Sequence, residues 1–182
     1  MADTDRDRWN AKWAAIEEIP RPHWLLRDYA ELLAGGTAVD LACGLGQNSL
    51  WLARHGYQVL ALDLSEVALQ RGLAAAVAQG LAGRISFVQQ DLDVWRPAPA
   101  SCDLIVIFRF LDRRLFPWLR AALRPGGLIF YQTLHQGARQ RMTQANPAYL
   151  LAPGELITHF GGWEIIHAQE DASHSELIAR KR

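Results

Sequence analysis

Short apolar runs alternate with helix-like segments along most of the chain. Each apolar run is bounded by polar or glycine-containing turns, a pattern that predicts buried strands. These strands are expected at 37–42, 58–63, 85–89, 103–108 and 128–133. Helical patterns between the strands predict helices at 47–55, 65–79 and 115–123, and Ser65 is suited to cap the second of them. Pro125-Gly126-Gly127 predicts a turn before the fifth strand. Strands that are apolar throughout and alternate with helices predict a parallel sheet that is covered on both faces.

The two ends of the chain add further elements to this core. Residues 5–33 predict two helices, which are interrupted at Pro20-Arg21-Pro22. Residues 154–160 predict a short helix, and 163–169 and 176–180 predict two more strands. The fold class that follows is α/β, with a doubly wound, mostly parallel seven-stranded sheet and N-terminal helices.

The expected organisation is a single domain over residues 1–182. Residues 1–34 form N-terminal helices that partly cover the ligand site, and residues 35–182 form the α/β core. Trp9 and Trp13 are four residues apart and therefore share one face of the first helix. They either dock this helix on the body of the domain or help it to cover the site, and the sequence leaves both interpretations open.

The turn after the first strand is where we expect the chemistry. In a doubly wound sheet the ligand lies beyond the carboxyl ends of the strands. Gly44 and Gly46 allow a ligand to approach the backbone closely and permit a positive φ. Asp40 lies in the first strand, Asp63 ends the second and Asp91 follows the third. Because parallel strands share one carboxyl edge, we expect these three carboxylates to gather near the glycine turn.

The carboxylates favour a ligand that carries positive charge. A dinucleotide would bring a pyrophosphate close to Asp40, and Ser49 stands where the dinucleotide motif has its third glycine. Asp63 is suited to the two hydroxyls of a ribose, Asp91 to an exocyclic amine, and Asp40 to an ammonium or sulfonium. For each aspartate alone, the alternative is a helix cap or a turn residue.

Several motifs resemble the class I S-adenosylmethionine-dependent methyltransferases. VDLACGLGQNS resembles their first motif, LALDLS the second and QQDLDVW the third, while CDLIVIF and LRPGGLIFYQT resemble the fourth and fifth strands. FLDRRLFPWLRAALRPGG and NPAYLLAPGEL resemble a narrower group, the small bacterial tellurite-resistance-like branch. Members of that branch often have Glu-Thr-Phe where this chain has Gln132-Thr133-Leu134.

The resemblance implies S-adenosyl-L-methionine as the cofactor and a set of residues that bind it. These residues are Asp40, Gly44, Gly46, Asp63, Leu64, Asp91, Leu92 and Phe108. The first three would line the methionine moiety, the next two the ribose, the following two the adenine, and the last would lie near the methyl-bearing sulfur. Arg109 is expected to turn away, because a cation beside a sulfonium is unfavourable.

Composition narrows the choice of partners and compartment. Half of the 182 residues are apolar, and 19 basic residues balance 19 acidic ones. The chain therefore has no overall field that attracts nucleic acid or an anionic membrane. We expect a small-molecule acceptor, no nucleic acid and no membrane. The two cysteines and the polar N-terminus fit a reduced cytoplasmic setting without a signal peptide.

The acceptor side is less well defined by the sequence. Its candidates are His135, Arg113 and Arg139, together with the loop residues Arg114, Arg141, Asn146 and Tyr149. His135 is either a base or a loop hydrogen-bonder, and the arginines belong either to an anion site or to a solvated loop. The spacing of histidines and cysteines predicts no metal site.

The leading hypothesis is methyl transfer to a small acceptor with an S, Se, Te, O or N nucleophile. The reaction is an in-line displacement in which proximity supplies much of the rate and no base is obligatory. Two alternatives remain open at this stage. One is a non-catalytic module that binds S-adenosylmethionine or S-adenosylhomocysteine, and the other is a nicotinamide-dependent reductase. The sequence does not indicate an oligomeric state.

Overall fold

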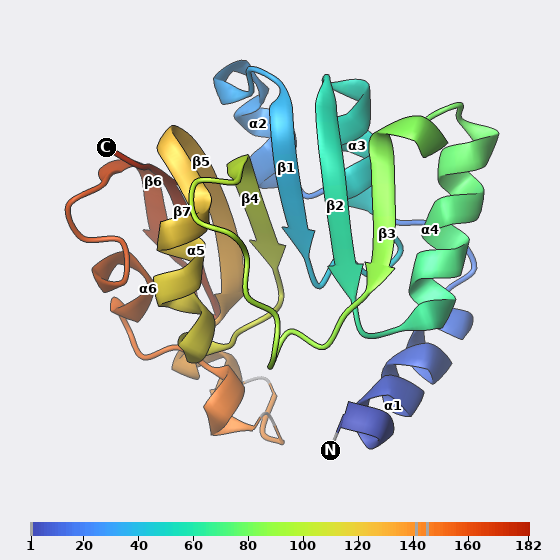
Figure 1. Ribbon diagram of the computed structural model, residues 1–182. Coiled ribbons are helices and arrows are strands. Elements are labelled where there is room, and N and C mark those ends of the chain that lie inside the picture. Colours follow the sequence, from blue (N-terminus) through green and yellow to red (C-terminus); the bar gives the residue numbers. More distant parts are fainter. Residues whose placement is uncertain (1, 141, 145) are drawn as a thin grey trace. The chain divides into compact units, whose positions relative to one another are not determined.

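The computed structural model describes residues 2–140, 142–144 and 146–182. The chain divides into two compact units, Met1–Trp95 and Arg96–Arg182. Each unit contains strands together with the helices that pack on them (Figure 1).

The first unit is built on three parallel strands. They are β1 (Gly36–Leu41), β2 (Tyr57–Asp63) and β3 (Ile85–Gln89), in the order β3-β2-β1. All three arrowheads point to the same edge in Figure 1. The register pairs Asp40 with Ala61 and Asp63 with Gln89. Asp40 and Asp63 therefore lie close to the carboxyl edge of this part of the sheet.

Two helices pack against these strands. The first, α3 (Gln47–Arg54), contacts β1 and β2, and the second, α4 (Glu66–Ala78), contacts β2 and β3. The Ser65 hydroxyl accepts a hydrogen bond from the Ala68 N–H and so caps α4. Two further helices, α1 (Ala2–Ala14) and α2 (Trp24–Asp28), precede the sheet, and α1 packs beside the beginning of α4 (Figure 1).

The second unit holds four strands in the order β4-β5-β7-β6. Their bounds are β4 Cys102–Phe108, β5 Leu123–Leu134, β6 Glu164–Glu170 and β7 His174–Arg180. The β4–β5 pair is parallel, whereas β7 runs antiparallel to β5 and β6. Helix α5 (Phe116–Ala122) and the short helix α6 (Glu155–Thr158) complete the unit. Phe116 of α5 stacks on Tyr131 of β5, which fixes the face that α5 covers.

The predicted strands and helices are confirmed, with shifts of a few residues at their ends. The largest difference concerns the predicted Pro-Gly-Gly turn, which lies inside β5 as an irregularity in its pairing with β4. Gly126 has a φ of +81° there, and its N–H donates to the Lys181 carbonyl, so the chain continues as strand on both sides. Five short 3-10 turns were not predicted, at 30–32, 82–84, 113–115, 136–140 and 147–149.

The helices and the two cysteines show whether the chain has features of a membrane or disulfide-bonded protein. Among the described residues, no helix combines the length and the apolar character needed to cross a membrane. Cys43 and Cys102 are buried and form no disulfide. Burial raises the pKa of the Cys102 thiol to about 11 and that of Cys43 well above its ordinary value, so both thiols are unreactive packing groups.

Candidate functional site

The turn between β1 and α3 has an unusual backbone. Ala42, Gly44 and Gly46 have φ values of +55°, +54° and +74°. This region favours glycine because a Cβ crowds the following carbonyl. Ala42 is not a glycine, so the surrounding structure must hold the turn in its conformation. Strain of this kind is common at ligand-binding turns.

Packing within the protein also requires glycine at both predicted positions. A Cβ on Gly44 would lie 2.8 Å from Cζ2 of Trp13, and one on Gly46 would lie 2.7 Å from Cε1 of Phe87. Both distances are too short for ordinary contact. The two glycines therefore admit an aromatic ring on each side of the turn, whatever a ligand requires in addition.

Asp63 braces the glycine turn. Its Oδ2 accepts the Gly44 N–H at 2.8 Å, and its Oδ1 accepts the Ser65 N–H at 2.9 Å. Burial raises the pKa of this carboxyl, while these two hydrogen bonds and the nearby Lys12 act in the opposite direction. Asp63 thus links the end of β2 to the glycine turn and to the start of α4. A carboxylate oxygen has more than one lone pair, so both oxygens retain capacity for a ligand.

Asp40 is more deeply buried and only 1% exposed. Its Oδ2 accepts a short hydrogen bond of 2.6 Å from the Ser49 hydroxyl in the first turn of α3. Burial and the neighbouring Asp63 raise the pKa of Asp40 to about 7, although the Ser49 hydrogen bond acts against the shift. The carboxyl is therefore close to half protonated at neutral pH, and a cation brought near it would favour its ionised form.

The remaining predicted residues of this unit lie along the same edge. Asp91 follows β3 and is half-buried, and its Oδ1 accepts the Asp93 N–H at 2.9 Å, as in the turn-residue alternative. Leu92 is buried, and Leu64 is half-buried with its carbonyl accepting the Gln89 side-chain amide. The strand ends therefore bring these residues to one edge together with Asp63.

Two side chains, Asn10 and Arg71, fasten helix α1 to α4. The Asn10 Oδ1 accepts the Ser65 hydroxyl at 2.6 Å, at the beginning of α4. Arg71 of α4 donates to the carbonyls of Trp13, Ile16 and Glu17, which lie at and just after the end of α1. The Lys12 ammonium lies 5.1 Å from the centre of the Trp13 ring, and its charge opposes the rise in the pKa of Asp63 that burial causes.

Two buried polar atoms beside the glycine turn have no hydrogen-bond partner. They are Nε1 of Trp13 and Oε1 of Gln47, the first residue of α3. A buried polar group without a partner costs about 1–3 kcal/mol, so such groups commonly face a ligand or water. Gln47 was not among the residues predicted from the sequence. A polar residue at the start of a helix is common, and nothing in its local pattern marks it.

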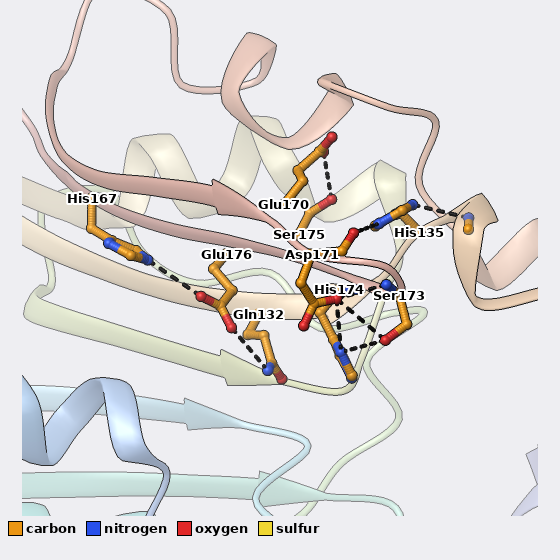
Figure 2. A network of polar contacts seen from close by, with 10 residues as sticks. Gln132, His135, His167, Glu170, Asp171, Ser173, His174, Ser175 and Glu176 are labelled. Carbon is orange, nitrogen blue, oxygen red and sulfur yellow. Dashed lines mark hydrogen bonds and ion pairs between the residues drawn. The ribbon is translucent and has the colours of Figure 1, made fainter. Parts of the chain in front are cut away.

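The second unit contains the predicted residues that follow the fourth and fifth strands. Phe108 is the last residue of β4, and the next residue, Arg109, is exposed with a φ of +61°. Gln132 of β5 donates to Glu176 of β7 at 3.4 Å, and the other Glu176 oxygen lies 3.3 Å from Nε2 of His167 (Figure 2). Oε1 of Gln132 is buried without a partner. Gln132 stands where the tellurite-resistance-like branch often has a glutamate. Glu176 of the adjacent strand β7 places a carboxylate beside it.

His135 has both ring nitrogens engaged by the backbone. Nδ1 accepts the Gly137 N–H at 3.0 Å, which leaves the proton on Nε2, 2.9 Å from the Asp171 carbonyl (Figure 2). The side chain is 7% exposed. This geometry favours the loop hydrogen-bonder interpretation over a general base.

Most acceptor-side candidates have partners within their own unit. Arg113 forms a bidentate pair with Glu155 at 2.6 and 2.8 Å, which lowers the pKa of Glu155 to about 2. Arg114 pairs with Asp112, Asn146 caps the turn at 147–149, and Tyr149 is exposed. Arg139 lines an open groove with Gln136, Gln140, Thr143 and Pro147. Arg141 lies outside the described residues.

Part of the chain is similar in sequence to known methyltransferases. Residues 38–127 match the family model of a methyltransferase domain. The ubiquinone biosynthesis O-methyltransferase of Ralstonia nicotianae is 32% identical over 155 residues, which are 80% of this chain and 60% of that protein. The ribosomal RNA small subunit methyltransferase C of Alcanivorax borkumensis is 31% identical over 105 residues, 52% of this chain and 31% of that protein.

Among solved structures, TehB from Haemophilus influenzae shares the fold with a TM-score of 0.75. The similarity covers 97% of this chain and 67% of that one, at 20% identity. The doubly wound α/β fold class is thereby confirmed. The match of residues 38–127 to a methyltransferase domain and the methyltransferase names of the curated relatives support the predicted S-adenosylmethionine-dependent methyltransferase and its cofactor.

The chain spans between 31% and 60% of the length of the two curated relatives described above. One of them is named for ribosomal RNA and the other for ubiquinone biosynthesis, so the relatives do not agree on an acceptor. The expectation that nucleic acid is not a partner therefore stays a prediction.

The residues around the glycine turn fit the cofactor chemically. S-adenosylmethionine carries a sulfonium, an ammonium, a carboxylate and a ribose. Asp40 and Asp63 supply negative charge, and the unpartnered atoms of Gln47 and Trp13 supply one acceptor and one donor. All four side chains belong to the first unit.

Proposed function

We propose that the protein transfers the methyl group of S-adenosylmethionine to a small-molecule acceptor. One observation carries the proposal: two buried carboxylates, Asp40 and Asp63, border a positive-φ glycine turn at the carboxyl edge of parallel strands. This arrangement suits a cationic nucleoside better than a dinucleotide, because a pyrophosphate would be repelled by Asp40.

The proposed cofactor contacts are those that the resemblance implied. Asp40, Gly44 and Gly46 would line the methionine moiety, Asp63 and Leu64 the ribose, Asp91 and Leu92 the adenine, and Phe108 the reactive end. Asp63 is held in place by two backbone N–H groups, so its carboxylate is preorganised before a ribose arrives.

The bound cofactor supplies an activated methyl group on a good leaving group. The protein's task is to orient the acceptor and exclude water, and such positioning can contribute effective molarities of about 10⁵–10⁸ M. His135, with both nitrogens in backbone hydrogen bonds, serves to hold the loop after β5. Catalysis by proximity without an obligatory base fits these contacts.

We propose a small acceptor bound near the loops that follow β4 and β5. The open groove around Arg139 offers a guanidinium, amides and a hydroxyl, which suit an anionic or hydrogen-bonding group of such an acceptor. We also propose a cytoplasmic location, because a reducing compartment keeps cysteines such as these two in the thiol form.

The test is to incubate the purified protein with S-adenosylmethionine and a panel of thiols, catechols, amines, selenite and tellurite. Mass spectrometry would follow S-adenosylhomocysteine and the methylated acceptor, with Asp63→Ala as the control variant. We expect product with at least one acceptor, and much less with the control variant.

The alternatives give different results in the same experiment. Cofactor binding without any product across the panel would select a binding module. Binding of a nicotinamide dinucleotide in place of S-adenosylmethionine would select a reductase. Methylation of an RNA oligonucleotide included in the panel would refute the small-molecule acceptor and retain the reaction type.

A further inference from the structure

Two polar atoms without a hydrogen-bond partner lie beside the glycine turn, and one of them is an acceptor while the other is a donor. Oε1 of Gln47 is a hydrogen-bond acceptor, and Nε1 of Trp13 is a donor, and both are buried. Gln47 follows Gly46 directly, and the Trp13 ring rests against Gly44. Both atoms therefore belong to the same turn, although 33 positions separate the two residues in the sequence.

The six-membered ring of Trp13 lies against the glycine turn. The three Trp13 atoms nearest to a Cβ on Gly44 are Cζ2, Cη2 and Cε2, at 2.8, 2.9 and 3.5 Å. Nε1 is bonded to Cε2, so the unpartnered donor is one bond away from the atoms that contact the turn.

A ligand that satisfies both atoms must offer a donor and an acceptor. The α-amino carboxylate of an amino acid has this combination, since its ammonium donates and its carboxylate accepts. The adjacent charges agree with it: Asp40 favours the ammonium, and Lys12, which lies over the faces of Trp9 and Trp13, favours the carboxylate.

We propose that Gln47 and Trp13 together recognise the α-amino carboxylate of the cofactor. The Gln47 carbonyl accepts a hydrogen bond from the ammonium, and the Trp13 indole N–H donates to the carboxylate. The inference rests on S-adenosylmethionine as the cofactor and not on the identity of the acceptor. It adds a residue from α1, which lies outside the segment matched by the family model.

The attachments of α1 give Trp13 a defined position for this role. Asn10 and Arg71 tie α1 to α4 at two places, the first three residues before Trp13 and the second at the carbonyls of Trp13 and Ile16. A ligand residue that is anchored on both sides loses little conformational entropy when it binds. Helix α1 is then a specificity element that distinguishes cofactors with an amino-acid moiety from nucleosides without one.

The experiment compares three ligands by isothermal titration calorimetry. S-adenosylhomocysteine carries the complete amino-acid moiety, its decarboxylated analogue keeps only the amine, and 5′-methylthioadenosine lacks both groups. Each ligand is titrated into the full-length wild-type chain and into Trp13→Phe, Gln47→Leu and the control Trp9→Phe. Thermal unfolding of each variant confirms that it is folded.

Each variant should affect only the ligands that carry its partner group. Trp13→Phe should lower the affinity for S-adenosylhomocysteine by about 10- to 100-fold, which is the range for a lost hydrogen bond to a charged group. The affinities for the other two ligands should stay nearly unchanged. Gln47→Leu should weaken the first two ligands and spare 5′-methylthioadenosine. Trp9→Phe removes an indole from the same helix and should leave all three affinities close to wild type.

Equal losses for all three ligands would show that Trp13 and Gln47 only pack the turn, and the proposal would be refuted. Wild-type binding that is no tighter for S-adenosylhomocysteine than for 5′-methylthioadenosine would refute it as well. Neither result depends on turnover. A failure to find methylated product therefore bears on the proposed reaction and leaves this inference standing on its own measurement.

Discussion

Replacing Asp40 with asparagine should make the stability of the protein less sensitive to pH. Asp40 is 1% exposed, and its pKa is raised from 3.8 to about 7, mainly by burial. Asparagine has nearly the same shape, keeps an oxygen that can accept the Ser49 hydroxyl, and does not ionise. The substitution therefore removes one titration and changes little else in the packing.

The size of the effect follows from the two pKa values. A shift of about 3 pKa units makes ionisation of this carboxyl cost the fold about 4 kcal/mol at a pH well above 7. Because the native-state pKa is raised, the stabilising contribution of Asp40 is complete below pH 3.8 and is lost as the pH rises through 7. About 1–2 kcal/mol of it is already lost near pH 5, so about 2–3 kcal/mol is lost between about pH 5 and pH 8.

The assay is thermal unfolding of wild type and Asp40→Asn across this pH range. At about 2–4 °C per kcal/mol for a chain of this size, the difference in Tm between the two proteins should change by roughly 5–10 °C in favour of the variant at the higher pH. Other titrating groups occur in both proteins and cancel in this comparison. A difference in Tm that stays constant from low to high pH would refute the assigned burial and charge of Asp40.

The same carboxyl should link cofactor binding to pH. A cationic ligand beside Asp40 favours its ionised form, so the affinity for S-adenosylmethionine should increase as the pH rises through about 7. Calorimetry in buffers of different ionisation enthalpy should detect protons released on binding near neutral pH. Asp40→Asn should bind more weakly and release fewer protons. An unchanged proton count in the variant would show that Asp40 is not near the ligand's charge.

Three further substitutions test other parts of the structure. Asp63→Ala should lower the affinity for S-adenosylhomocysteine by a factor of about 10 or more in calorimetry, because the variant loses charge-assisted hydrogen bonds to the ligand and the hydrogen bond that holds Gly44. Unchanged affinity would show that the ribose contact is misplaced. Gly44→Val should lower the Tm and prevent cofactor binding, because the new side chain would clash with the Trp13 ring and because a φ of +54° is unfavourable for valine. A variant that melts and binds like wild type would contradict the packing at the turn. His135→Gln should keep most of the methyl transfer rate with an active acceptor, and loss of turnover with cofactor affinity intact would establish His135 as a base.

Much of the fold was predictable from local pattern. Apolar runs that alternate with helical segments located all seven strands, and the Ser65 cap marked the beginning of α4. The Pro-Gly-Gly segment was predicted as a turn because both residue types favour turns. Pairing with β4 and the hydrogen bond from Gly126 to Lys181 keep it within β5, and such partners are not visible in a local window.

The candidate site was predictable in part for a similar reason. The positions of Asp40, Asp63 and Asp91 at strand ends follow from the order of elements, since parallel strands present their carboxyl ends at one edge. The partners of their oxygens do not follow from that order. Asp63 accepts N–H groups from the glycine turn and from α4, which is a matter of three-dimensional packing.

The sequence by itself determined which residues reach the carboxyl edge, because strand length and alternation are local properties with a fixed geometry. Only the tertiary structure decided that Trp13 lies on Gly44, that Phe87 fills the space beside Gly46, and that His135 gives both nitrogens to the backbone. The first two contacts join segments that are distant in the chain, and the third depends on the loops around His135. Close packing of side chains fixes such contacts, and no periodicity in the sequence encodes them.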